Sequence, residues 1–149
     1  VIELENVSDI YRLVPTEGKI LKPIKINESE KSKKLVRVVT KTSINKETTQ
    51  TGFHDGRSTL AEVKASVGDT CVMQIPDQKI LDIIKLEAGC QGLVVRGINA
   101  GQIGKVESVE KGTFILPKRV ILTLGDKKIE IPADIIMPIG KEEPVIQLK

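Results

Sequence analysis

Aromatic residues are nearly absent from this sequence. They make up 2% of it, as Tyr11, Phe53 and Phe114, and there is no tryptophan. Stacking of bases on rows of aromatic rings is therefore not expected as a main binding mode. Any recognition of RNA by this chain should depend on phosphate, ribose and shape.

Residues that hold metals or carry out catalysis are also scarce. The only histidine is His54, and the two cysteines, Cys71 and Cys90, give no zinc-ligand spacing. Asp55-Gly56 is typical of a hairpin turn, and no nucleophile and base lie at a catalytic spacing around it. We predict no enzymatic activity, no metal site and no cofactor. Both cysteines lie in apolar contexts and are expected to be buried, reduced thiols rather than a disulfide.

The sequence has little net charge and no long hydrophobic run. The net charge is +3 with a pI near 8.8, and there is no long basic tail. A surface that binds nucleic acid must then be a local patch, although a solvated mixed-charge surface would give the same counts. No signal peptide and no apolar run of membrane-spanning length is visible, which predicts a cytoplasmic protein without a membrane partner. The sequence does not begin with Met, and we expect a piece of a longer protein.

Residues branched at Cβ and regularly spaced turn residues are abundant. Hydrophobic residues make up 40% of the chain, mainly Ile, Val and Leu, and 12 glycines and seven prolines punctuate it. Branched side chains pack well on pleated sheets, and closely spaced turn signals are typical of small barrels or sandwiches. No long window shows the period of an amphipathic helix. We predict an all-β fold with two small β-barrel domains.

The expected strands divide the chain into two units. Strands are predicted at residues 10–14, 20–26, 35–44, 48–53, 60–65, 70–75, 80–86, 93–95, 103–109, 120–124, 128–131 and 136–139. A boundary near residues 86–89 would separate a central β domain, residues 1–86, from an SH3-like barrel, residues 87–149, with a 3₁₀ turn at residues 132–135. The polar run at residues 27–34 is expected to be a mobile surface loop, with RNA contact as the alternative.

The stretch at residues 90–110 is the most informative part of the chain. It consists of an apolar strand, a short loop with Gly97, Gly101 and Gly104, and a second strand of alternating pattern. Glycines at these spacings allow a tight turn, positive φ angles and backbone N–H groups that are open to a ligand. This is the pattern of a KOW motif, which occurs in small β-barrels that bind RNA or ribosomal partners. It contains no Walker loop and no dinucleotide-binding fingerprint, but a Gly-rich hairpin without function remains an alternative.

Basic residues beside turns are the candidate contacts to RNA phosphates. Each of them can also be a solvated surface charge, and the pair that flanks the glycine loop, Arg96 and Lys105, is the strongest candidate. The site predicted from the sequence consists of Arg57, Arg96, Asn99, Lys105, Lys118 and Arg119, together with the loop glycines Gly97, Gly101 and Gly104.

Short segments spread over the whole chain carry a family resemblance. They are residues 9–15 (DIYRLVP), 54–57 (HDGR), 67–70 (VGDT), 75–80 (IPDQKI) and the KOW-like residues 96–106. Because these segments occur in this order and at this spacing, the chain resembles the e-type ribosomal protein S-four family of archaeal and eukaryotic small subunits. Such proteins carry an N-terminal RNA-binding module, a central β domain and a C-terminal KOW barrel. The resemblance implies that this chain holds the last two parts, with residues 7–14 as a remnant of the first.

The resemblance implies a structural role in the small ribosomal subunit. The expected partners are small-subunit ribosomal RNA, bound through phosphate and shape contacts, and neighbouring ribosomal proteins. The chain would be cytoplasmic, associated with the ribosome and monomeric when isolated, and its richness in Lys and Ile fits an archaeal source. The alternative is a KOW-type module of a transcription or translation factor that mainly binds protein. An apolar groove beside the glycine loop, rather than a basic rim, would favour that alternative.

Overall fold

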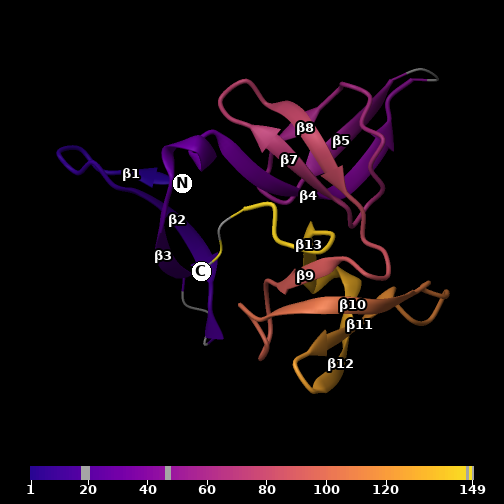
Figure 1. Cartoon of the computed structure of the whole chain (residues 1–149). Helices are drawn as coiled ribbons and strands as arrows, with labels where there is room; N and C mark the ends of the chain where they lie inside the picture. Colours follow the sequence, from indigo (N-terminus) through magenta and orange to yellow (C-terminus); the bar gives the residue numbers. More distant parts are fainter. Residues whose placement is uncertain (18–20, 46–47, 147, 149) are drawn as a thin grey trace.

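Three antiparallel β-sheets contain the strands of the described residues (Figure 1). The computed structural model describes residues 1–17, 21–45, 48–146 and 148. The first sheet has the order β1 (Ile2–Glu3), β2 (Ile10–Pro15), β3 (Leu21–Ile26). The central sheet has the order β6 (Ser58–Thr59), β5 (Thr49–Phe53), β4 (Lys33–Ser43), β7 (Thr70–Gln74), β8 (Lys79–Ile84). The third sheet has the order β12 (Lys127–Pro132), β11 (Arg119–Leu124), β10 (Ile103–Glu110), β9 (Gln91–Val94), β13 (Ile136–Gly140).

The prediction of an all-β fold is confirmed. The helices among the described residues are two short 3₁₀ turns, η2 (Glu28–Glu30) and η3 (Ala133–Ile135), and η3 lies where such a turn was predicted. Neither is long and apolar enough to cross a membrane. The closed barrels are not confirmed, because in the described part of the chain no ladder joins β6 to β8 or β12 to β13.

A strand occurs in every predicted range except residues 60–65. Residue 20, where one strand was expected to begin, lies outside the described residues. The alternating pattern of residues 60–65 has another cause, since Val63 and Ala65 are buried in the core of the central sheet. Lys41 Nζ donates a hydrogen bond to Val63 O at 2.8 Å, so a side chain and apolar packing hold this segment in place of a ladder.

Strand β4 organises the central sheet because it changes partners along its length. Residues 33–37 pair with β7, and residues 38–43 pair with β5. Successive side chains of a strand point to opposite faces, so Leu35 and Val36 enter different cores. Val36 belongs to a core shared with β5 and β7, whereas Leu35 faces the third sheet.

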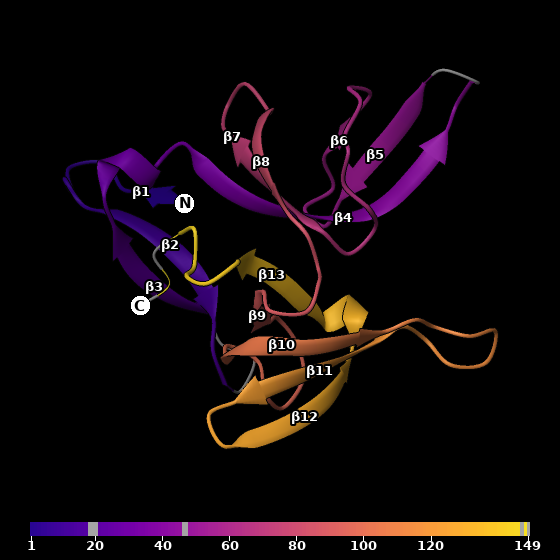
Figure 2. The same cartoon turned by 45° about the vertical axis from the view of Figure 1, so that its right-hand side comes forward.

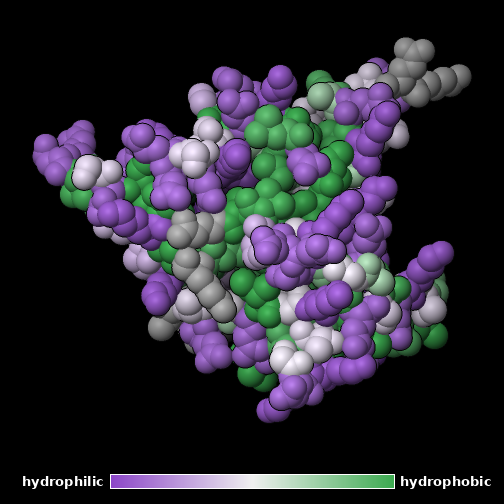
Figure 3. Space-filling model, in the orientation of Figure 1, coloured by the Kyte–Doolittle hydropathy of each residue, from purple (hydrophilic) through white to green (hydrophobic). Residues whose placement is uncertain are grey.

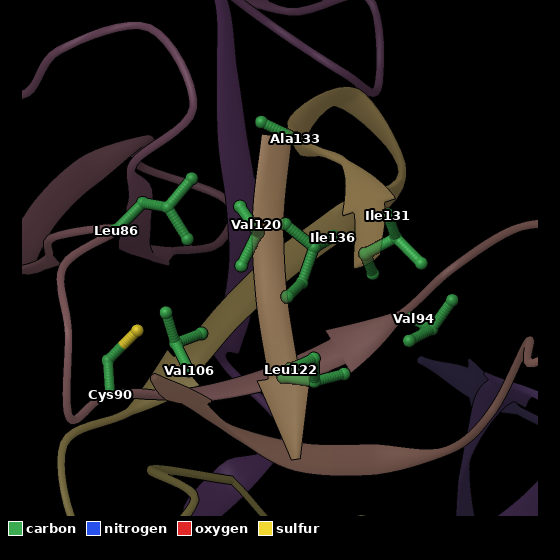
Figure 4. Close-up of a cluster of buried hydrophobic side chains, with 9 residues drawn as sticks. All are labelled: Leu86, Cys90, Val94, Val106, Val120, Leu122, Ile131, Ala133 and Ile136. Atoms are coloured by element: carbon green, nitrogen blue, oxygen red, sulfur yellow. The ribbon is translucent and has the colours of Figure 1, made fainter. Parts of the chain in front are cut away.

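Two cores hold the third sheet in place. Figure 4 shows one of them, in which apolar side chains from several strands point toward one another: Leu86, Cys90, Val94, Val106, Val120, Leu122, Ile131, Ala133 and Ile136. The other core lies between the central and third sheets, and its buried members are Leu35, Val72, Ile84, Leu93, Met137, Ile139 and Ile146. Each large apolar side chain that is fully buried stabilises the fold by about 1.5–3 kcal/mol. The two sheets are therefore packed together and not merely linked by the chain.

Two further expectations concern the segments between strands. The proposed boundary near residues 86–89 falls between β8 and β9, and the division into two domains stays a prediction. Residues 27–34, expected to be a mobile loop, contain η2 and the first residues of β4. Arg12 of β2 makes an ion pair of 2.6 Å with Glu30 of η2, which ties this run to the first sheet.

Both cysteines are free and buried, as predicted. Burial raises the pKa of Cys71 to about 11, and burial likewise raises the pKa of Cys90. We expect neither thiol of the folded protein to react within minutes with an aromatic disulfide reagent at about pH 8, where the thiolate fraction of Cys71 is about 0.1%. Unfolding in the absence of reductant should expose two reactive thiols. A fast-reacting thiol in the folded protein, or fewer than two after unfolding, would contradict this expectation.

Candidate nucleic-acid interface

The predicted glycine loop, residues 95–102, joins β9 to β10. Gly97 has a φ angle of +90° and Gly101 one of +86°, in the left-handed region that other residues rarely adopt. Gly104 is different, because it lies inside β10 with an ordinary φ angle. A Cβ atom at Gly104 would lie 2.4 Å from the carbonyl oxygen of Thr123 in β11. This glycine is therefore required by the close approach of two strands and not by the turn.

One side of the glycine loop is covered by the first sheet. A Cβ atom at Gly101 would lie 2.5 Å from the carbonyl oxygen of Pro15 at the end of β2. Beside it, Gln102 Nε2 donates a hydrogen bond to Glu17 Oε1 at 3.2 Å. The N–H groups of Ala100, Gly101 and Gln102 already donate to carbonyl oxygens of β9 and of the loop itself. This part of the loop is a contact surface within the protein and is not open to a ligand.

Another part of the loop is open to solvent. Among the described residues, no acceptor lies within hydrogen-bond distance of the N–H groups of Gly97, Ile98 and Asn99. Arg96 is exposed and makes no ion pair with any residue that the structure describes. Successive N–H groups beside a glycine of positive φ can bind an anion, and a guanidinium adds charge to such a site. Arg96, Gly97 and Asn99 of the predicted site therefore come together here.

A cleft of about 370 Å³ lies beside this loop, where the three sheets meet. Much of its wall is apolar and comes from β2, β9, β13 and residues 146 and 148. Figure 3 shows apolar residues across the middle of one face of the molecule, with hydrophilic residues on either side. The remaining lining includes Arg12, Lys33, Lys34, Arg37, His54 and Arg96, and no carboxylate of the described residues takes part. A cleft lined by charge of one sign concentrates the electrostatic field and attracts ions of the opposite sign.

Only part of this positive charge is available to a ligand. Arg12 contacts a carboxylate of η2 at 2.6 Å, and Lys34 Nζ lies 2.6 Å from Asp55 Oδ2. In contrast, Lys33 and Arg96 make no ion pair with the described residues. An anion in the cleft would therefore be attracted mainly by these two cations, because the charges of Arg12 and Lys34 are partly neutralised.

Arg37 connects the central sheet to the third sheet. Its Nη1 donates to the carbonyl oxygens of Asp134 and, at 3.1 Å, of Ile136, with a longer contact of 3.5 Å to that of Ala133. Burial lowers the pKa of this guanidinium, Asp134 opposes the shift, and the nearby charge of Arg96 adds to it. Sequence reasoning did not find this role, and no local signal could have revealed it, because Asp134 lies 97 positions away.

The turn after β5 is a hairpin turn, as predicted, and its histidine has a structural role. Gly56 has a φ angle of +84°, and Asp55 Oδ1 accepts a hydrogen bond from Arg57 N at 3.2 Å. His54 N donates to Arg37 O, and His54 Nδ1 accepts from Arg37 N, both at 3.0 Å. Burial lowers the pKa of His54, and nearby cations lower it further against the opposing charge of Asp55. The neutral imidazole thus positions Arg37. No group of three or more metal-ligating side chains occurs in the described residues.

Arg57 is less accessible than its place beside the turn would indicate. Its side chain is 34% exposed, and its Nε lies 3.7 Å from Asp55 Oδ2. Its Nη1 is buried and has no hydrogen-bond partner in the described part of the chain. Because a buried donor without an acceptor costs about 1–3 kcal/mol, a ligand oxygen that reached this nitrogen would be bound favourably.

The other predicted residues lie along β10 and at its far end. Lys105 is exposed on β10 and has no ion-pair partner among the described residues. Lys118 and Arg119 lie at the opposite end of β10 from the glycine loop, where a long hairpin leads to β11 (Figure 2). Arg119 Nη1 contacts Glu130 Oε1 at 2.6 Å, and this hydrogen bond raises the pKa of Arg119. The predicted site therefore consists of two groups, one at the glycine loop and one at Lys118 and Arg119, which are separated by the length of β10, about 26 Å.

Comparison with known proteins identifies the family. The model of Ribosomal family S4e matches residues 7–80. The small ribosomal subunit protein eS4 of Staphylothermus marinus is 38% identical over 160 residues, which cover 99% of this chain and 63% of that protein. The chain belongs to ribosomal family S4e. Its S4e relative from Methanothermobacter thermautotrophicus is 34% identical over 149 residues, which cover 99% of the chain and 62% of that protein.

A solved S4e structure has the same fold. The crystal structure of the 30S ribosomal protein S4e of Thermoplasma acidophilum matches with a TM-score of 0.73 and 26% identity, over 88% of this chain and 66% of that one. The resemblance found in the sequence is confirmed, and the archaeal sources of these S4e proteins agree with the composition. The chain spans about 63% of the length of the Staphylothermus protein. The partners of complete S4e proteins are therefore carried to it only as a proposal.

Proposed function

We propose that this chain is a structural part of the small ribosomal subunit and binds ribosomal RNA through phosphate and shape contacts. Its membership of family S4e, with relatives named as small-subunit proteins, supports the ribosomal role. The observation that carries the RNA part is the open glycine loop, where Arg96 and the N–H groups of Gly97, Ile98 and Asn99 are without partners among the described residues. Phosphate oxygens accept hydrogen bonds from guanidinium and backbone N–H groups alike.

The proposal includes the surroundings of this function. Neighbouring ribosomal proteins are further partners, the location is cytoplasmic and on the ribosome, and the isolated chain is a monomer without catalytic activity. Residues 1–86 act as the central β domain and residues 87–149 as the KOW barrel. The proposed RNA contacts are Arg57, Arg96, Asn99, Lys105, Lys118 and Arg119, with Lys33 added because it lines the cleft without an ion pair to a described residue.

The salt dependence of RNA binding tests this proposal. Each contact between a basic side chain and a duplex phosphate contributes about −0.9 to the slope of log affinity against log salt concentration. Changing Arg96 and Lys105 together to alanine should therefore flatten the slope by about 2, and by the same amount on unrelated RNA duplexes. The measurement is a titration of labelled small-subunit ribosomal RNA with the chain at several salt concentrations.

A second double variant provides the control for net charge. Changing Arg57 and Arg119 to alanine removes the same charge, but both arginines already have carboxylate neighbours, Asp55 and Glu130. This variant should flatten the slope by less than half as much, because pairing weakens a direct phosphate contact. A salt-independent affinity, or an affinity lost on one base sequence alone, would contradict the RNA proposal.

A protein-binding module remains the second candidate because the wall of the cleft is apolar. Leu13 and Leu21 line the cleft and are 41% and 57% exposed. Both the apolar groove that would favour protein binding and the basic lining that would favour RNA are therefore present beside the glycine loop. Changing Leu13 to serine should leave RNA affinity unchanged if the loop and its cations bind RNA. If the basic variants bind RNA as the parent does, a protein ligand of the cleft becomes the better account.

A further inference from the structure

The hairpin that joins β10 to β11 carries the most exposed aromatic side chain of the chain. It contains eight residues, 111–118, and projects beyond the rest of the molecule (Figure 2). At its tip, Phe114 is 107% exposed, Ile115 is 87% exposed and Leu116 is 49% exposed. A large apolar side chain is commonly at least partly covered, and burying one stabilises a protein or a complex by about 1.5–3 kcal/mol. Three consecutive apolar residues on a projecting tip therefore indicate a surface that is covered by a partner.

The tip has a defined turn geometry. Thr113 N donates to Leu116 O at 2.8 Å, and Leu116 N donates to Thr113 Oγ1 at 3.2 Å, which closes the turn around Phe114. The two arms come close together below the tip, because a Cβ atom at Gly112 would lie 2.8 Å from Lys118 N. A closed turn presents the ring of Phe114 in a restricted set of positions, which lowers the entropy cost of binding.

The charges beside the tip identify the kind of partner. Lys111 and Lys118 are exposed on the two arms and make no ion pair with the described residues. No carboxylate occurs between residues 111 and 118. An apolar ring between two free cations complements a nucleic acid, in which flat bases lie between phosphates. A protein pocket could bury the ring, but it would leave these lysines without counter-charges unless the rim of the pocket were acidic.

We infer that Phe114 stacks on an unpaired base of the ribosomal RNA, while Lys111 and Lys118 contact the phosphates on either side. This inference rests on the proposed RNA-binding function and adds a second point of contact. The tip and the glycine loop lie at opposite ends of β10, so they are at least about 26 Å apart and must meet different parts of the RNA. Such a bivalent contact would fix the orientation of the third sheet on the RNA, which a single phosphate site does not.

A single tryptophan can report on this contact because the sequence contains none. In the Phe114→Trp variant, added single-stranded RNA or a small-subunit ribosomal RNA transcript should quench the indole fluorescence by about half or more, as expected for a ring stacked on a base. A fully paired RNA duplex should not quench it. Leu60→Trp is the matched control, since Leu60 is 59% exposed and follows β6 of the central sheet, and its fluorescence should not change.

Affinity measurements provide the second readout. Phe114→Ala should weaken binding to the transcript by about tenfold with an unchanged salt slope, whereas Lys111→Ala with Lys118→Ala should flatten the slope by about 1.4, the value for two phosphates of an unpaired segment. If the chain binds the transcript but Phe114→Trp is not quenched and Phe114→Ala binds as the parent does, the stacking inference is wrong and the proposed function stands. If the chain binds no RNA at all, both are wrong. If the duplex quenched the indole fluorescence to the same extent, or if the fluorescence changed only when ribosomal proteins were added, Phe114 would make a contact other than base stacking and the inference would be wrong.

Discussion

Changing Gly104 to alanine is expected to lower the free energy of unfolding by about 3 kcal/mol. Its Cβ atom would lie 2.4 Å from the carbonyl oxygen of Thr123 and 2.9 Å from Leu122 Cγ. The first of these atoms belongs to the backbone of β11, so it cannot rotate away, and β10 and β11 would have to separate. Leu122 belongs to the core shown in Figure 4, which would be disturbed as well. Denaturation by urea, followed by far-UV circular dichroism, measures the loss.

Gly97 provides the control for this prediction. An alanine there meets only Ile135 Cδ1 at 3.9 Å, but it must adopt a φ angle of +90°. The expected cost is that of backbone strain alone, about 1–2 kcal/mol. If Gly97→Ala is the more damaging change, or if Gly104→Ala unfolds at the same urea concentration as the parent, then close strand packing does not explain the glycine in β10.

Changing Arg37 to methionine is expected to lower the free energy of unfolding by about 3 kcal/mol and the melting temperature by about 6–12 °C. Methionine keeps an unbranched apolar side chain but removes the hydrogen bonds to the carbonyl oxygens of Asp134 and Ile136. Hydrogen bonds from a charged donor contribute about 1.5–3 kcal/mol each, and partial exposure of this site lowers that figure. Differential scanning calorimetry measures the shift.

Arg37→Lys distinguishes charge from geometry. Lysine keeps the positive charge but lacks the planar group that reaches several carbonyl oxygens at once. It should recover less than half of the lost stability. Full recovery would show that the charge alone matters, and a methionine variant that melts within about 1 °C of the parent would show that the contact between the sheets does not depend on Arg37.

The same arginine links stability to the proposed binding surface. His54 holds the backbone of Arg37, the Arg37 guanidinium holds η3, and the N–H group of Val95, next to Arg96, donates to Ile135 O at 2.9 Å. This chain of hydrogen bonds positions the start of the glycine loop relative to the central sheet. A weaker contact between the sheets should therefore also weaken RNA binding, through the position of Arg96.

Local sequence signals predicted those features that arise within a few residues. The Asp55-Gly56 turn, the positive φ angles of Gly97 and Gly101, and the strand at residues 103–109 follow from glycine placement and from alternation of apolar residues. The same alternation produced the wrong strand at residues 60–65. Apolar packing without a ladder leaves the same pattern as a strand, so periodicity alone cannot separate the two.

The sequence also contains an apolar run in a loop whose importance the low aromatic content does not indicate. An aromatic content of 2% predicts little base stacking, yet Phe114 lies in an apolar run between Gly112 and Pro117. Its exposure of 107% depends on the hairpin standing apart from the sheets. Whether an apolar run in a loop is buried or exposed is decided by what lies around it.

The all-β class, the position of most strands and the turn glycines could be predicted from the sequence, because side-chain branching, alternation and glycine conformation act locally. The order and spacing of short segments indicated the family. Which basic residues are available to a ligand depends on contacts that form only in the folded protein. Arg119 is paired with Glu130, and Arg37 is bonded to η3, while Arg96 has no partner among the described residues. These differences depend on distances and burial between segments far apart in the chain, which determine the strength of a charge interaction and which no local pattern encodes.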